Sequence, residues 1–168
     1  EDPSKPKCGH NLKYDLLVLR NAGVELRGLE HPESCDSMVA SYLIDPSRSS
    51  HSLDALALAL LGRTNISISE LIGTGKDQKC FDSVPIDLAT AYAAEDADVA
   101  LQLRERMMPQ IRALGMAKLM HEVEMPLVGV LADLEWNGLR VDPHERDRQR
   151  VRLRAKLAEI RAALGREC

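Results

Sequence analysis

Two short segments of this sequence place a polar side chain and an aspartate one helical turn apart. Asn11 and Asp15 lie in NLKYD, and Tyr92 and Asp96 lie in YAAED. On a helix, residues i and i+4 share one face, and apolar neighbours at helical spacing predict that this face is buried in both segments. A carboxylate on a buried face needs a metal ion, a cation or a strong hydrogen bond. Asp15 and Asp96 are therefore candidate metal ligands.

The second segment has the clearer pattern, because it lies in the longest predicted helix, residues 85–108. One stripe of this helix carries Asp96 among larger side chains. The stripe contains Leu88, Tyr92, Val99 and Leu103. Glu95 and Asp98 fall on the opposite side, where we expect them to be solvated.

Periodicity and breaker residues predict a mainly helical chain. Helices are expected at 11–22, 37–44, 53–61 (ended by Gly62), 85–108, 118–136 and 144–164, and strands near 6–9 and 24–29. Asp36 is expected to cap the second helix rather than to bind metal. Pro109 is expected to break or kink the long helix, and Pro126 to bend or split the next one. Residues 63–83 are expected to form a surface loop around one short helical turn.

Composition restricts the classes of function. The net charge is −4, but residues 144–167 hold eight basic and four acidic residues, so a basic helix follows an acidic body. Such a helix suits contact with a phosphate backbone, and the alternative is a solvated helix with i,i+4 ion pairs. Aromatic residues make up only 3%, which disfavours single-strand binding on aromatic platforms. The four cysteines form no Cys/His cluster, so we expect reduced thiols rather than a zinc site.

Several segments, in the same order, resemble the 3′-to-5′ exonuclease domain of bacterial DNA polymerase I. They are KCGHNLKYD (7–15), DSM and SYL (36–43), HSLD (51–54), GTGKDQ (73–78) and YAAEDADVALQL (92–103). The stretch EMPLVGVLADLEWNGLRVDP (124–143) resembles the passage from the exonuclease into the polymerase domain, and it favours polymerase I over ribonuclease D-type exonucleases. The resemblance implies two parts: the C-terminal part of an exonuclease domain at 1–117, and the beginning of a family A polymerase domain at 118–168.

The fold that the resemblance implies is α/β, of the ribonuclease H-like 3′-to-5′ exonuclease type. We expect the chain to lack the first strands of that sheet, because it begins after the corresponding segment of the family. The expected result is a mainly α chain with one or two short strands, followed by thumb-side helices of the polymerase. Apolar surface where the absent strands would pack is expected to be exposed and to favour self-association.

The resemblance also implies roles for the paired residues. Asp15 and Asp96 would bind metal ions, Mg²⁺ or Mn²⁺, that act in the two-metal hydrolysis of DNA phosphodiesters. Tyr92 would orient the attacking water, and Asn11 would line the site beside the terminal nucleotide. The alternatives are ordinary helix acids for the two aspartates, a core tyrosine for Tyr92 and a helix N-cap for Asn11.

Two loop residues are weaker candidates for substrate contact. His51 and Arg48 precede a predicted helix and are polar groups that can meet a DNA phosphate. Exposed polar side chains are common on loops, however, so ordinary loop residues without substrate contact are the alternative. We expect a single-stranded 3′ end of DNA at the exonuclease site and duplex DNA near the basic C-terminal helix.

The family's first motif, an Asp-x-Glu that supplies two further carboxylates, has no counterpart before Lys7. We therefore expect this chain to contribute to proofreading within a DNA-directed DNA polymerase I, with little or no exonuclease activity when isolated. The alternatives are a non-catalytic exonuclease-like scaffold that supports the polymerase, and a ribonuclease D-like exoribonuclease. Since no apolar run could span a bilayer or act as a secretory signal, a cytosolic location is expected. The resemblance implies the bacterial cytoplasm, at the nucleoid.

Overall fold

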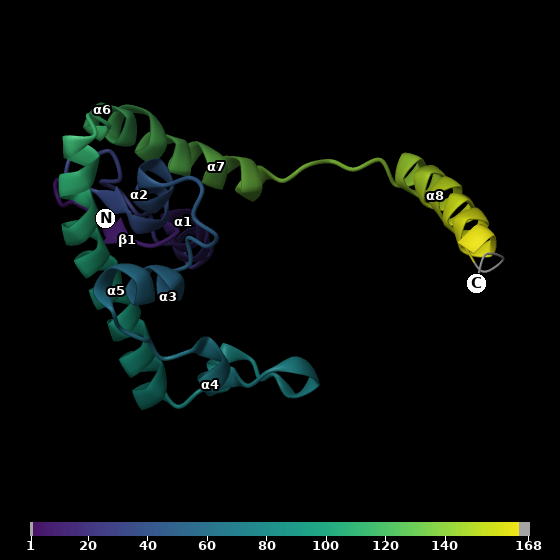
Figure 1. The fold of residues 1–168 in the computed structure, drawn as a ribbon, viewed down its shortest axis with the longest axis horizontal. Helices are drawn as coiled ribbons and strands as arrows, with labels where there is room; N and C mark the ends of the chain where they lie inside the picture. Colours follow the sequence, from purple (N-terminus) through teal and green to yellow (C-terminus); the bar gives the residue numbers. More distant parts are fainter. Residues whose placement is uncertain (1, 165–168) are drawn as a thin grey trace. The chain divides into compact units, whose positions relative to one another are not determined.

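In the computed structural model, which describes residues 2–164, nearly all regular structure is helical (Figure 1). The mainly α chain predicted from the sequence is therefore confirmed. The chain divides into two compact units, Glu1–Trp136 and Asn137–Cys168. The expected boundary at 117/118 separates an exonuclease segment from a polymerase segment. The division into compact units does not test that boundary, which stays a prediction.

A short parallel ladder lies at the centre of the first unit. Strand β1 (Cys8–Gly9) pairs with β2 (Cys35–Asp36), with Cys8 opposite Cys35 and Gly9 opposite Asp36. The strand predicted near 6–9 is thus confirmed. Cys8 and Cys80 are exposed and Cys35 is buried, all as free thiols as expected, while Cys168 lies outside the described residues.

The strand predicted at 24–29 is wrong. The chain leaves the preceding helix through Gly23, with Val24 N donating to Leu19 O at 2.8 Å, and no strand is assigned from Val24 to Leu29. Apolar and polar residues do alternate in this segment, but the described residues provide no neighbouring strand with which the segment could pair. The segment is fastened instead at Gly28, whose carbonyl accepts a hydrogen bond from Ser34 Oγ at 2.6 Å.

Asp36, at the end of β2, joins the ladder to two helices. Its carboxylate accepts backbone hydrogen bonds from Met38 (2.9 Å) and Val39 (3.4 Å) at the start of α2 (Ser37–Ile44). The same carboxylate accepts from the backbone of Asn11 (3.0 Å) and Leu12 (2.7 Å) at the start of α1 (Leu12–Asn21). The predicted cap of the second helix is confirmed, and the residue, only 2% exposed, caps the first helix as well.

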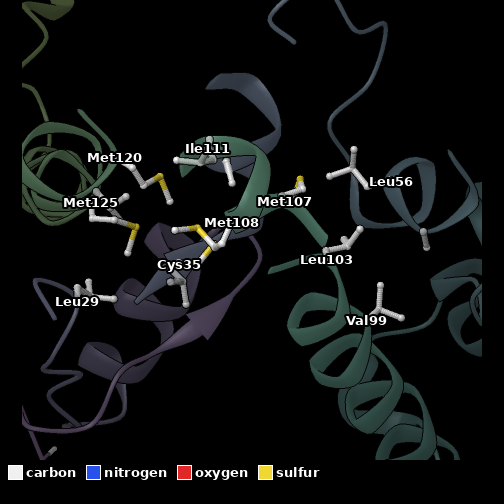
Figure 2. Packing of buried hydrophobic residues seen from close by; sticks show 14 residues of the cluster. Leu29, Cys35, Leu56, Val99, Leu103, Met107, Met108, Ile111, Met120 and Met125 are labelled. Atoms are coloured by element: carbon white, nitrogen blue, oxygen red, sulfur yellow. The ribbon is translucent and has the colours of Figure 1, made fainter. Parts of the chain in front are cut away.

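The long helix α5 (Ile86–Ala113) supplies one wall of the core. Its buried side chains recur at helical spacing and meet residues from the ladder, α2 and the helices that follow (Figure 2). Those on α5 are Val99, Leu103, Met107, Met108 and Ile111. Of the break or kink expected at Pro109, the break is wrong, because the helix continues to Ala113. The kink stays a prediction. Proline removes one backbone hydrogen bond, and burial on both sides of Pro109 outweighs that loss.

The segment between α2 and α5 contains only short helical turns. Helix α3 (Leu53–Leu56) continues into a π-helical turn, η1 (Ala57–Leu61), which Gly62 ends in a left-handed conformation with φ 68°. The helix predicted at 53–61 is therefore confirmed, with a wider last turn. Within the predicted surface loop lie α4 (Ile68–Ile72) and two 3-10 turns, η2 (Gly75–Asp77) and η3 (Phe81–Ser83).

The helix expected at 118–136 is present in three consecutive pieces. They are α6 (Ala117–Leu119), a π-helical turn η4 (Met120–Glu124) and α7 (Met125–Asn137). Pro126 cannot donate to a carbonyl one turn earlier, so a wider turn before it is a physical response to the missing hydrogen bond. The predicted irregularity at Pro126 is confirmed as a π-helical turn.

The second unit contains α8 (Pro143–Leu164), which matches the predicted final helix. The Asp142 carboxylate accepts the backbone N–H of His144 at 2.9 Å, as an N-cap does. None of the described residues of α8 is buried within its own unit. No described helix in either unit is both long and apolar enough to cross a membrane.

Replacing the Asp36 carboxylate should destabilise the first unit. Asp36→Ala removes two helix caps and leaves backbone N–H groups unpaired, so we expect a loss of about 2–4 kcal/mol in the free energy of unfolding. Urea unfolding followed by circular dichroism measures this change. Glu30→Ala, which removes an exposed carboxylate, is the control and should change stability by less than about 0.5 kcal/mol. Equal stability of the two variants would contradict the double-cap interpretation.

Candidate functional site

Asn11 occupies the N-cap position of α1 without capping it. Its backbone is left-handed, with φ 60° and ψ 50°, and its side chain makes no capping hydrogen bond. Asparagine tolerates this conformation better than most residues. Because Asp36 caps the helix, the alternative role of Asn11 as the capping side chain is wrong. Its half-buried amide remains available to another partner.

The sequence predicted that Asp15 lies on a buried face, and this prediction is wrong. The residue is exposed, and so are its neighbours Tyr14 and Val18, whereas Leu12 forms the buried edge of α1. The physical reason is that few described elements cover this side of the short helix. Loss of hydration around the carboxyl group nevertheless raises the pKa of Asp15, and repulsion from the Asp36 charge adds to the increase.

Helix α1 is also held by α7. Arg20 donates to the Asp133 carboxylate at 2.7 Å, and its guanidinium lies 4.4 Å from the ring centroid of Trp136. Lys13 forms an ion pair with Glu135. A groove of about 530 Å³ lies between the two helices. These contacts fix the orientation of the helix that carries Asn11 and Asp15.

Tyr92 and Asp96 lie one turn apart on α5 and interact. The Tyr92 hydroxyl interacts with the Asp96 carboxylate, and both residues are partly buried. Desolvation raises the pKa of Asp96, while the hydrogen bond with Tyr92 opposes that rise. Desolvation and then the nearby Asp96 charge raise the pKa of Tyr92 to about 12. The pair predicted from spacing therefore exists, and it consists of a protonated phenol beside an acid that is poorly hydrated.

Glu95 was expected in solvent, and this expectation is wrong. Its carboxylate accepts the backbone N–H of Ile66 at 2.6 Å and a hydrogen bond from Arg63 at 2.7 Å. Arg63 also reaches Asp98, which is exposed as predicted, at 3.3 Å. The backbone hydrogen bond from Ile66 lowers the pKa of Glu95. Helical periodicity could not reveal this role, because the partners come from a distant loop.

A third acid, Asp54, acts on the Tyr92–Asp96 pair. Its negative charge contributes to the raised pKa values of both side chains. The Asp54 carboxylate accepts a hydrogen bond from Asn65 Nδ2 at 3.2 Å. The sequence analysis did not single out Asp54, although the residue lies in the HSLD segment that carries part of the resemblance.

The two loop candidates, His51 and Arg48, have partners within their own region. His51 Nδ1 lies 2.9 Å from Ser41 Oγ, and its ring stands edge-on to Tyr42 with centroids 5.5 Å apart. Arg48 pairs with Asp45 at 4.0 Å. These contacts order the loop, and contact of either residue with DNA stays a prediction.

The charges that act on Asp15 and on Asp96 come from different residues, Asp36 for the first and Asp54 with Glu95 for the second. Within the described part of the chain, no group of three or more His, Cys, Asp or Glu side chains is arranged to hold a metal ion. The side chains of Asp15 and Asp96 are nevertheless suitable ligands for Mg²⁺ or Mn²⁺, which prefer carboxylate oxygens. Both carboxylates have raised pKa values from lost hydration, and a bound cation would stabilise their charged forms.

The segment that holds the ladder, the surrounding helices and the Tyr92–Asp96 pair is similar to known proteins. A family model described as 3′-5′ exonuclease matches residues 1–112. DNA polymerase I of Pseudomonas aeruginosa is 42% identical over 145 residues, covering 84% of this chain and 15% of that protein. DNA polymerase I of Rhizobium leguminosarum is 42% identical over 142 residues, covering 84% of this chain and 14% of that protein. The chain therefore belongs to the 3′-5′ exonuclease family of bacterial DNA polymerase I.

A solved structure agrees with this assignment. The POL domain of Pol1 from M. smegmatis, in complex with DNA primer-template and dNTP, superposes with a TM-score of 0.63 at 26% identity. The match covers 84% of this chain and 20% of that chain. This chain spans about 15% of the length of the curated relatives it matches. The family resemblance read from the sequence is confirmed.

The Tyr92–Asp96 interaction can be tested by titration of Asp96. Tyr92→Phe removes a hydrogen bond that stabilises the charged carboxylate, so the pKa of Asp96 should rise further above its ordinary value. Carbon-13 NMR of the aspartate carboxyl groups, followed over about pH 3–7, measures the pKa directly. Tyr42→Phe removes a hydroxyl elsewhere in the first unit and should leave the titration of Asp96 unchanged. An unchanged or lower pKa in Tyr92→Phe would show that the two groups do not interact.

Proposed function

We propose that this chain contributes to proofreading in a DNA polymerase I, as part of a site that hydrolyses DNA phosphodiesters from the 3′ end. The observation that carries the proposal is the Tyr92–Asp96 pair, one turn apart on α5 within the segment that matches the 3′-5′ exonuclease family. The Pseudomonas and Rhizobium relatives are both named DNA polymerase I, which favours this reading over a ribonuclease D-like exoribonuclease.

In this proposal Asp15 and Asp96 would hold Mg²⁺ or Mn²⁺. Two such ions would stabilise negative charge on the attacking and leaving oxygens and make the bound water more acidic. The raised pKa values of both carboxylates support the assignment, because lost hydration is the main cause of each shift and a bound cation would offset it. Two carboxylates are a small ligand set for two ions, so we propose that they do not suffice for hydrolysis by the isolated chain.

Tyr92 would position the attacking water rather than remove its proton. With a pKa of about 12, its hydroxyl stays protonated near neutral pH and makes a poor general base. The hydrogen bond to Asp96 would set the direction of the hydroxyl. Asn11, whose side chain is not used for capping, would contact the terminal nucleotide. His51 and Arg48 would lie near a DNA phosphate.

A non-catalytic scaffold is the second candidate function. Two observations favour it. Asp15 is exposed, and the acidic residues that influence the pKa of Asp15 differ from those that influence the pKa of Asp96. In that case the exonuclease fold would support a polymerase and hold DNA without cleaving it. The two candidates differ in whether Tyr92 and Asp96 affect cleavage.

Removal of either member of the pair should reduce exonuclease activity in the full product of the gene. Asp96→Ala should lower kcat by roughly 10³-fold, because a metal ligand supports several kcal/mol of charge stabilisation. Tyr92→Phe should lower kcat by about 10²-fold through loss of positioning. Gel assays with labelled single-stranded DNA and Mg²⁺ or Mn²⁺ measure both effects.

Asp98→Ala is the matched control, since Asp98 lies on the same helix but is exposed on another side. It should retain activity, and polymerase activity of the same preparations verifies folding. If neither the parent nor any variant trimmed DNA, the scaffold function would be correct. If all three variants trimmed DNA as fast as the parent, the proposed roles of Tyr92 and Asp96 would be wrong.

We propose duplex DNA as the partner of α8. The described helix carries six arginines and one lysine, and Arg148 and Arg150 are engaged with acids of the same helix, Glu145 and Asp147. Side-chain exposure of 76% at Arg148 makes it accessible to a phosphate. The similar structure from M. smegmatis is a complex with DNA primer-template, which supports DNA as a partner.

Charge reversal on α8 tests this contact in the full product of the gene. Arg148→Glu, Arg152→Glu and Arg161→Glu should weaken duplex binding and reduce the slope of log affinity against log salt by about 1 for each lost phosphate contact. Fluorescence anisotropy at several KCl concentrations measures both quantities. Arg106→Glu on α5 is an exposed control expected to have a smaller effect. Unchanged affinity and slope in the triple variant would rule out this partner surface.

A further inference from the structure

One large loop side chain packs directly on the ring of Tyr92. Phe81, the only phenylalanine of the chain, has its ring centroid 6.1 Å from that of Tyr92, with the planes inclined by 56°. This distance and tilt are within the favourable range for an aromatic pair. Phe81 remains 42% exposed, so the contact with Tyr92 is not a by-product of burial in the main core.

The segment that carries Phe81 is fastened to α5 at its base. Glu95, one turn from Tyr92 along α5, holds both Ile66 N and Arg63 as described above. Further along, Lys79 N donates to Ile72 O at 2.8 Å and closes the loop on itself. Figure 1 shows α4 and the turns after it as a lobe beside the N-terminal part of α5.

Local hydrogen bonds also hold the turn that presents the ring. Val84 N donates to Phe81 O at 3.0 Å, and Ser83 N donates to Cys80 O at 3.1 Å. Pro85 follows directly and leads into α5. Phe81 is therefore placed by a short rigid turn joined to the helix that bears Tyr92. A fixed turn limits the number of positions that the Phe81 ring can adopt.

We propose that Phe81 is a positioning residue of the exonuclease site, which orients the Tyr92 ring and through it the attacking water. A tyrosine side chain has two soft torsions, and the ring of Tyr92 is restrained by Phe81, while its hydroxyl interacts with the Asp96 carboxylate. Restraint of the ring limits the directions that the hydroxyl can take before substrate binds. This inference rests on the proposed function of Tyr92.

The experiment is a double-mutant cycle in the full product of the gene. Phe81→Ala should lower the kcat of single-stranded DNA trimming roughly tenfold and leave the KM for DNA unchanged, because the ring orients a catalytic group without contacting DNA. Phe81→Tyr keeps an aromatic ring and should restore kcat to near the parent value. In the Tyr92→Phe background, Phe81→Ala should have no further effect on kcat.

Leu58→Ala is the matched control, since Leu58 is an apolar side chain 62% exposed on η1. It should leave kcat unchanged. A purely structural role of Phe81 would lower thermal stability without changing kcat, and circular dichroism with Phe81→Leu as a second variant separates that case. An unchanged kcat in Phe81→Ala, or an equal loss with and without Tyr92, overturns the inference while the proposed function stands. Full activity of Tyr92→Phe alone overturns the proposed role of Tyr92, and the inference with it.

Discussion

The Asp36 carboxylate accepts backbone hydrogen bonds from the first turns of both α1 and α2, and it does so at the end of one of two very short strands. A two-residue ladder has few hydrogen bonds of its own, so the carboxylate provides much of what joins these elements. A buried carboxylate needs such partners to offset its lost hydration. Since Asp36 takes over the cap of α1, the side chain of Asn11 makes no capping hydrogen bond.

The second constraint is helix α5, which packs into the core along one half of its length and carries residues of the proposed site along the other half. Its C-terminal half packs into the core through Val99 to Ile111, while its N-terminal half carries Tyr92, Glu95 and Asp96. Glu95 and Phe81 attach the preceding loop to that half. The rigid core therefore supports a site that is built partly from a loop, an arrangement in which the helix supplies the position and the loop restrains the side chains.

Sequence reasoning succeeded where local pattern decides structure. The cap at Asp36, the stop at Gly62 and the Tyr92–Asp96 pair all follow from residues within one or two turns. Prediction from the sequence failed where residues far apart in the chain determine the structure. Residues 24–29 alternate like a strand but lack a neighbour to pair with among the described residues, and Glu95 looked solvated although Arg63 and Ile66 bind it. The exposure of Asp15 has the same origin, because the helix period fixes a face without fixing what covers it.

The central claim is that Asp15 and Asp96 belong to one metal-dependent site that acts on DNA. Crystals of the full product of the gene, soaked in Mn²⁺ and measured at the manganese absorption edge, test it most directly, because anomalous difference peaks locate the ions independently of activity. The account predicts peaks at about 2.0–2.3 Å from carboxylate oxygens of both Asp15 and Asp96, since manganese prefers such ligands. Peaks at neither residue, in crystals where Mn²⁺ is bound elsewhere, would contradict it.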